Sequence, residues 1–148
     1  MSLVTTIEAD LITAMKAGDA DKLSVLRMTK SALKNKSIEL GHELSDDEAI
    51  AVIGREMKQR RDAEAEFRAG NRPELADKEA AEAAMLAEYL PAQLSEAELV
   101  PLVEAAIAKT GASTASDMGK VMGALMPETR GKADGSLVSK LVKERLGA

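Results

Sequence analysis

The stretch Met118-Gly119-Lys120-Val121-Met122-Gly123-Ala124-Leu125-Met126-Pro127, which continues to Arg130-Gly131-Lys132-Ala133-Asp134-Gly135, is the most distinctive part of this chain. It holds four of the ten glycines. Gly119 and Gly123 are four residues apart in an apolar segment that reads as a helix, so they share one face. A glycine inside a helix costs about 1 kcal/mol relative to alanine. We therefore expect these glycines to allow the close approach of another backbone in a tight helix–turn–helix.

The composition of the whole chain favours helices. Hydrophobic residues make up 45% of the 148 residues, but aromatic residues only 1%, so Leu, Ile, Val, Met and Ala must build the core. There is no cysteine, which excludes disulfides, thiolate nucleophiles and cysteine metal sites. His42 is the only histidine, and we expect it to be an exposed turn residue rather than a metal ligand or part of a Ser-His triad.

Apolar periodicity and helix-end signals predict an all-α fold without strands. Capping-box spacings place helix starts at Thr5, Ser45 and Ser95, and Pro127 is expected to end a helix. The predicted helices run over residues 5–17, 19–40, 45–69 and 73–89, then over 95–110 and 116–127, with a last helix after Asp134.

This pattern predicts two parts: an N-terminal bundle of about four helices over residues 1–90 and a small three-helix domain over 95–148. Residues 91–94, Pro91-Ala92-Gln93-Leu94, are predicted to form a hinge because Pro91 cannot continue the preceding helix. No heptad pattern is long enough for a coiled coil, so we expect a monomer.

No apolar run reaches the ~20 residues that a membrane span requires. No basic segment leads into an apolar run at the N-terminus. We therefore expect a cytoplasmic protein that does not contact membranes.

The long helix over 45–69 has an apolar face only in its first half. From Lys58 to Glu66 nearly every residue is polar. We expect this second half to project or to be lightly packed, with support from pairs such as Glu56–Arg60. A helix of this kind also motivates the hypothesis of a protein-interaction module.

The residues indicate no catalytic centre, cofactor site or metal site. Most carboxylates lie near a Lys or Arg at helical spacing, which is typical of a solvated face. No glycine-rich phosphate loop follows a strand, and no nucleophile elbow is visible.

The net charge of −5 is not typical of a nucleic-acid-binding protein, so any such contact must come from a local patch. One candidate is the stripe Arg27, Lys30 and Lys34, which a helix would place within about 60° of one another. Such a stripe suits phosphates, but it is also typical of a solvated face that balances neighbouring acids.

The second candidate patch lies in the distinctive stretch. Lys120, Arg130 and Lys132 could hold phosphate, with Gly119 and Gly123 letting backbone come close and the first amides of the last helix nearby. The alternative is purely structural. Glycines four apart allow tight helix packing, and Asp134 can cap the last helix itself, where its charge would oppose an anion.

Three segments carry a resemblance to a known family: residues 89–95 (Tyr-Leu-Pro-Ala-Gln-Leu-Ser), residues 118–123 and residues 130–135. In this order they resemble the GatB/YqeY-like family over the whole chain. Residues 94–146 are similar to the C-terminal domain of the B subunit of glutamine-dependent tRNA amidotransferase. The resemblance implies an all-helical protein whose tail holds tRNA, a role that would carry over to residues 118–134.

The departures limit what the resemblance implies. Nothing in the chain resembles the cradle domain of the amidotransferase B subunit, where the chemistry resides. The family label of carbon–nitrogen ligase activity with glutamine as amido-N-donor therefore reaches this chain only through the shared tail. The leading hypothesis is a tRNA-binding protein that is non-catalytic alone, with amidotransferase or tRNA-synthetase components as candidate partners. The alternative hypotheses are participation in glutamine-dependent amide transfer within a complex and a protein-interaction module.

Overall fold

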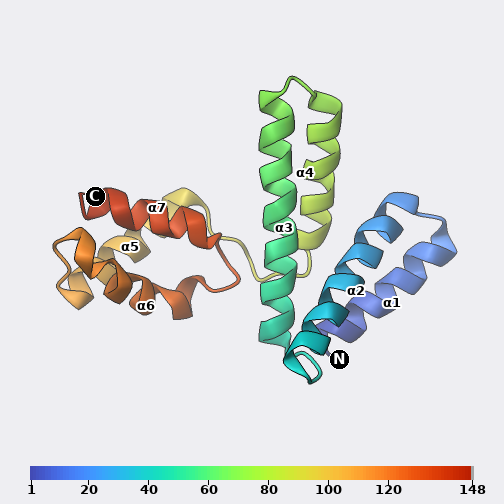
Figure 1. The fold of residues 1–148 in the computed structure, drawn as a ribbon, viewed down its shortest axis with the longest axis horizontal. Coiled ribbons are helices and arrows are strands. Elements are labelled where there is room, and N and C mark those ends of the chain that lie inside the picture. The colour runs from blue at the N-terminus through green and yellow to red at the C-terminus, as the bar shows by residue number, and fades with distance from the viewer. Residues whose placement is uncertain (148) are drawn as a thin grey trace. The chain divides into compact units, whose positions relative to one another are not determined.

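The computed structural model describes residues 1–147, and within them it confirms the all-α fold with seven α-helices and no strand. The chain divides into two compact units, Met1–Leu90 and Pro91–Ala148. Figure 1 labels the helices of each unit. The first unit contains α1 (Leu3–Ala17), α2 (Ala20–Leu40), α3 (Asp46–Ala69) and α4 (Pro73–Ala87). The second contains α5 (Glu96–Thr110), the 3₁₀ turn η1 (Ala115–Asp117), α6 (Met118–Thr129) and α7 (Gly135–Arg145).

Two of the three predicted capping boxes start helices as expected. The Ser45 hydroxyl accepts from the Glu48 amide (3.2 Å), and the Glu48 carboxylate accepts from the Ser45 amide (2.8 Å). Ser95 and Glu98 repeat this arrangement at the start of α5. Because both exchanges occur within four residues, the sequence spacing is sufficient to predict them.

Three predicted helix ends are wrong. α1 begins at Leu3, two residues before Thr5, because the Ser2 hydroxyl accepts the Thr5 amide (3.2 Å) and so caps the helix. α4 ends at Ala87 rather than Tyr89, because the amides of Tyr89 and Leu90 donate to the carbonyls three residues earlier, as in turns, and not four residues earlier, as in an α-helix. Pro127 lies inside α6, which continues to Thr129. Pro127 has no backbone amide hydrogen, so the Gly123 carbonyl, four residues earlier, loses its usual helical hydrogen-bond partner. The other hydrogen bonds of the helix are unaffected by this loss.

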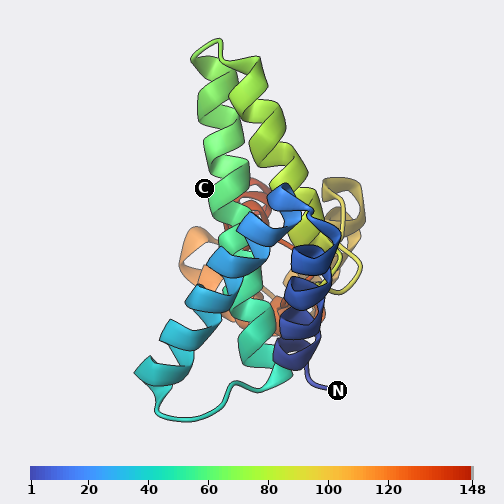
Figure 2. The same ribbon diagram turned by 90° about the vertical axis from the view of Figure 1, so that its right-hand side faces the viewer.

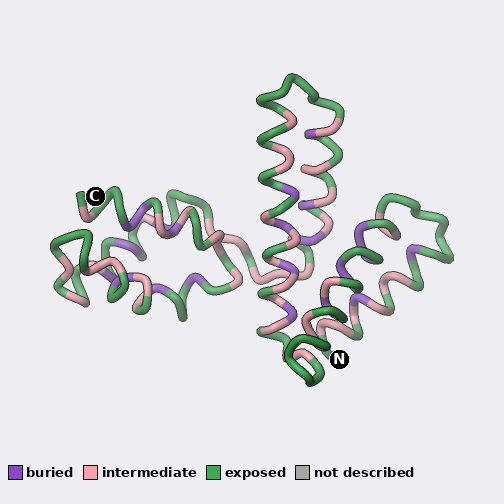
Figure 3. The backbone as a smooth tube through the Cα atoms, viewed as in Figure 1, coloured by how far each residue is buried: buried purple, intermediate pink, exposed green. Residues whose placement is uncertain are grey.

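The first unit buries one face of each of its four helices. Buried positions occur along each of these helices (Figure 3). Ile7, Leu26, Ile53 and Leu86, one from each helix, are fully buried. At the end of this unit the Tyr89 hydroxyl donates to Asp10 Oδ2 (2.5 Å), which ties the residues after α4 to α1. Burial, and then this hydrogen bond, raise the pKa of Tyr89 above its usual value, so the phenol keeps the proton it donates at neutral pH.

The second half of α3 projects as predicted, and among residues 58–69 only Arg60 is buried. α3 and α4 form an antiparallel pair whose far end extends beyond α1 and α2 in both views of the molecule (Figures 1 and 2). In this pair the Arg60 side chain is only 5% exposed and contacts the carboxylates of Glu56 and Glu82, each at 3.2 Å. A charge network around Arg60 therefore takes the place of the apolar face that the sequence lacks there.

The second unit has a smaller apolar core of its own. Its fully buried side chains come from all three α-helices and include Leu99, Val103, Val121, Leu125 and Val142. One face of α6 packs into this core, and the opposite face is exposed to solvent.

Candidate nucleic-acid interface

A tight turn follows α6 and carries two of the three cations proposed in the tail. Arg130 has φ −58° and ψ 123°, and Gly131 has φ 73°. The Lys132 amide donates to the Thr129 carbonyl (2.9 Å). These values match a type II β-turn, in which the third residue needs positive φ. Gly131 is therefore required by the backbone, and it fixes where Arg130 and Lys132 leave the turn.

Residues 91–94 hold this turn from the other side. The Gln93 side-chain amide donates to the carbonyls of Gly131 and Pro91, both at 2.8 Å. The Leu94 amide donates to the Lys132 carbonyl (2.8 Å). The segment predicted as a hinge is thus bonded into the second unit rather than being a free linker. Sequence reasoning missed Gln93, because a contact across 38 residues leaves no local periodic signal.

The N-terminus of α7 is capped by its own aspartate. Asp134 Oδ1 accepts from the Ser136 amide (3.0 Å). This is the alternative that the sequence left open, and it places a negative charge where a phosphate would have to approach the first amides. Any anion binding in this region must therefore depend on side-chain cations and not on the end of α7.

All three tail cations are exposed to solvent. Lys120 lies 4.0 Å from Asp117 Oδ1, a weak ion pair at a well-solvated position. Within residues 1–147 neither Arg130 nor Lys132 forms a side-chain ion pair or hydrogen bond. The two cations in the turn are therefore available to an external anion without the loss of an internal contact.

Asp117 is engaged mainly by the backbone. Its carboxylate accepts from the amides of Ser113 (3.0 Å) and Thr114 (3.2 Å). These two hydrogen bonds, and more weakly the charge of Lys120, hold the pKa of Asp117 below its usual value. Asp117 therefore shapes η1 at the start of α6, and it neutralises Lys120 only in part.

The glycines of α6 do not serve close helix packing. Gly119 and Gly123 are exposed, and a Cβ added to either would meet no atom within 4 Å. The expectation of a second backbone against them is wrong, because the buried face of α6 is formed by Val121 and Leu125 instead. By the 3.6-residue period Gly119, Gly123 and Met126 lie within about 60° of one another. We call these three exposed residues the glycine face of α6; Met126 is 54% exposed.

The basic stripe on α2 is partly neutralised. Lys30 pairs with Glu8 of α1 (3.5 Å), while Arg27 and Lys34 are exposed and form no ion pair in the described part of the chain. Lys30 therefore serves an internal contact, as the solvated-face interpretation expects. The stripe lies in the first unit and the tail cations in the second.

Other features add no catalytic group. His42 is exposed in the turn after α2, where Nδ1 lies 2.7 Å from the Glu43 carbonyl, which confirms its prediction as a turn residue. In residues 1–147 no three His, Cys, Asp or Glu side chains are grouped closely enough to hold a metal ion. None of the helices in that range has the length and apolar character to cross a membrane.

The fold places this chain among small all-helical proteins with a four-helix unit followed by a three-helix unit. A family model described as Yqey-like protein matches residues 4–146, and the chain belongs to this family. It is also similar to the altered inheritance of mitochondria protein 41, mitochondrial, of Pyrenophora tritici-repentis (strain Pt-1C-BFP). The two are 30% identical over 146 residues, which cover 96% of this chain and 80% of the fungal protein.

Proposed function

We propose that this protein binds tRNA through its second unit, using the glycine face of α6 together with Lys120, Arg130 and Lys132. The observation that carries the proposal is that Gly119 and Gly123 open onto solvent, although the fold gains nothing from a missing side chain there. Two such glycines on one exposed helix face leave the backbone open to the close approach of a ligand, next to the cations of the tail.

The chemistry of this surface suits an RNA backbone. Arg130 and Lys132 would contact phosphates, which accept cations without sequence information. The Gly123 carbonyl lacks its usual helix partner because Pro127 has no amide, so it can accept a hydrogen bond from a ribose 2′-hydroxyl. The type II turn and Gln93 limit the motion of the two cations, which reduces the entropy that binding must overcome.

The resemblance of residues 94–146 to the tail of the amidotransferase B subunit supports tRNA as the RNA in question. We propose a cytoplasmic monomer that is non-catalytic alone, with components of the amidotransferase or of tRNA synthetases as its protein partners. Participation in glutamine-dependent amide transfer rests on the resemblance alone. Arg27, Lys30 and Lys34 are a secondary part of the proposal, and we expect a smaller contribution from them because Lys30 already pairs with Glu8.

The glycine face provides the sharpest test by mutation. Gly123→Ala should raise the free energy of unfolding of the second unit by about 1 kcal/mol, and Gly119→Ala by less because it lies in the first helical turn. The variant that combines Gly119→Ala and Gly123→Ala should weaken tRNA binding about three- to tenfold, since the two added methyl groups keep the RNA from approaching the backbone of α6. Stability is measured by amide hydrogen exchange of the second unit, and binding by fluorescence anisotropy.

Two other glycines serve as controls. Gly54 of α3 has the same open surroundings, so Gly54→Ala should raise stability without changing tRNA affinity. Gly131→Ala should lower stability by about 1–2 kcal/mol, because a side chain disfavours the positive φ of this residue. If the Gly119→Ala/Gly123→Ala variant binds tRNA as tightly as the unchanged protein, the proposed contact is wrong.

A further inference from the structure

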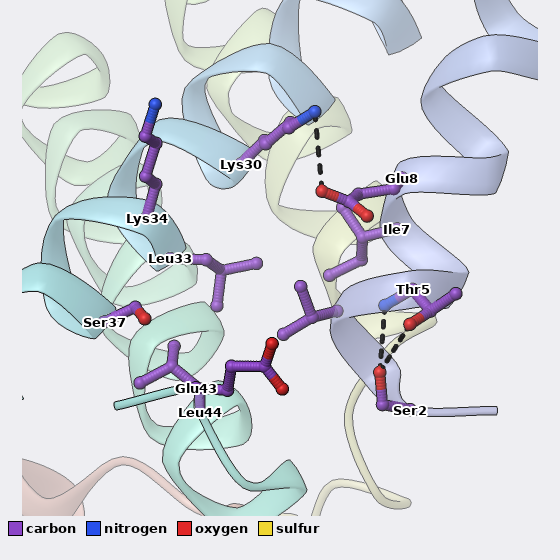
Figure 4. A pocket seen from close by; sticks show the side chains of 11 residues that line it. Ser2, Thr5, Ile7, Glu8, Lys30, Leu33, Lys34, Ser37, Glu43 and Leu44 are labelled. Carbon is purple, nitrogen blue, oxygen red and sulfur yellow. Dashed lines mark hydrogen bonds and ion pairs between the residues drawn. The ribbon is translucent and has the colours of Figure 1, made fainter. Parts of the chain in front are cut away.

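A pocket of about 360 Å³ opens in the first unit, and its lining includes Lys30 and Lys34 of the basic stripe on α2. Its walls are the start of α1, the second half of α2 and the loop between α2 and α3 (Figure 4). This volume lies in the range of about 300–1,000 Å³ that is usual for small-molecule sites. The pocket therefore has room for a ligand and not only for water.

The inner surface of the pocket is apolar. Ile7 and Leu33 belong to the core of the first unit, and the partly buried Val4 and Leu44 pack against that core. Because Ile7 and Leu33 are already buried, a ligand would cover mainly Val4 and Leu44, and it would gain about 25 cal/mol for each Å² of their apolar surface removed from water. The ligand should therefore contain an apolar group.

Two charges that line the pocket, those of Glu43 and Lys34, have no partner in the described residues. The Glu43 carboxylate points from the α2–α3 loop toward the start of α1 (Figure 4), and within residues 1–147 it forms no hydrogen bond or ion pair. The two lysines that line the pocket do not neutralise it. Lys30 is directed at Glu8, 3.5 Å away, and the Lys34 ammonium points away from Glu43 (Figure 4).

The hydroxyl groups that line the pocket already have hydrogen-bond partners. The hydroxyls of Ser2 and Thr5 are 2.7 Å apart, and Ser37 donates to the His42 carbonyl (2.6 Å). Of the two unpaired charges, Glu43 is the one that points across the pocket toward α1, so it is the group placed to orient a ligand (Figure 4). A carboxylate beside an apolar floor is complementary to a cation that is attached to an apolar group.

We propose that this pocket binds an organic ammonium that carries an apolar group, with the ammonium paired to Glu43 and the apolar group against Val4 and Leu44, above the buried Ile7 and Leu33. This chemistry has two sources: a free amine, or a lysine side chain next to apolar residues in a peptide. The site lies in the first unit, apart in sequence from the second-unit residues of the main tRNA proposal, although it shares Lys30 and Lys34 with the basic stripe on α2.

The test compares two probes of the same shape, 2-phenylethylamine, which is protonated at neutral pH, and the neutral 2-phenylethanol. Methyl NMR shifts of Val4, Ile7, Leu33 and Leu44 in the full chain report binding. We expect the amine to bind at least about tenfold more tightly than the alcohol, because both can donate a hydrogen bond to the carboxylate but only the amine brings a positive charge to pair with it. Glu43→Gln should abolish this preference.

Asp47→Asn is the matched control, since Asp47 is an exposed carboxylate that does not line the pocket. It removes the same charge and should leave the preference for the amine intact. Equal affinity for amine and alcohol, or an unchanged preference in Glu43→Gln, would overturn the proposal.

A further binding measurement with a peptide distinguishes a free amine from a lysine side chain as the ligand. An acetylated and amidated Leu-Lys-Leu peptide that binds more tightly than the amine supports a protein partner, and weaker binding supports a small amine. Because tRNA binding is measured separately, a failure here leaves the tRNA proposal unaffected, and the reverse also holds.

Discussion

Replacement of Lys120, Arg130 and Lys132 by alanine is expected to reduce the salt dependence of tRNA binding and to weaken binding at low salt. Each phosphate contact contributes about 0.7–0.9 to the slope of log affinity against log salt, so three contacts should lower this slope by about 2–3. Between about 50 and 200 mM salt, these contacts account for about a 20- to 40-fold change in affinity. Fluorescence anisotropy across a salt series measures both quantities.

The control for this variant carries the same change in net charge. Lys78, Lys109 and Lys143 are exposed and form no ion pair in the described residues. Their replacement by alanine should lower affinity only through the general field of the protein, which salt screens. Equal salt slopes for the two triple variants would contradict a specific contact at the tail cations.

Arg60→Ala is expected to lower the free energy of unfolding of the first unit by about 3 kcal/mol. The substitution removes the partner of Glu56 and Glu82, whose side chains are only 16% and 17% exposed. Two carboxylates would then remain close together in partly buried positions, with nothing to offset their desolvation. Urea unfolding followed by circular dichroism measures the loss.

Arg61 provides the comparison, because it is the next residue, is exposed and forms no ion pair within residues 1–147. Arg61→Ala should change the free energy of unfolding by less than about 0.5 kcal/mol. An Arg60→Ala variant as stable as Arg61→Ala would show that the buried network does not hold α3 to α4.

Sequence reasoning was most successful where the determining contacts are local. The capping boxes at Ser45 and Ser95 and the cap at Asp134 involve residues two or three positions apart, so their spacing was sufficient. The all-α fold followed from apolar periodicity for the same reason.

The errors arose where local signals competed or contacts were distant. Thr5 has a capping-box spacing, but Ser2 also offers a hydroxyl and caps α1. Pro127 is a helix breaker in isolation, whereas the packing of Val121 and Leu125 keeps α6 helical past it. Arg60 was correctly paired with Glu56, but its second partner Glu82 lies 22 residues on and could not be found from helical spacing.

The candidate site shows the same division. The sequence identified the cations and the glycines, but it favoured helix packing as the reason for Gly119 and Gly123. Only the three-dimensional structure shows that nothing covers them. Gln93 was missed as a support of the turn because its partner Gly131 is remote in sequence.

The most direct test of the central claim is an NMR titration of the isotope-labelled full chain with tRNA at physiological salt. The account predicts that shifts and line broadening concentrate in residues 118–134, with a response of the Gln93 side-chain amide, and that both fade as salt rises. An unchanged spectrum, or changes confined to the first unit, would contradict the account.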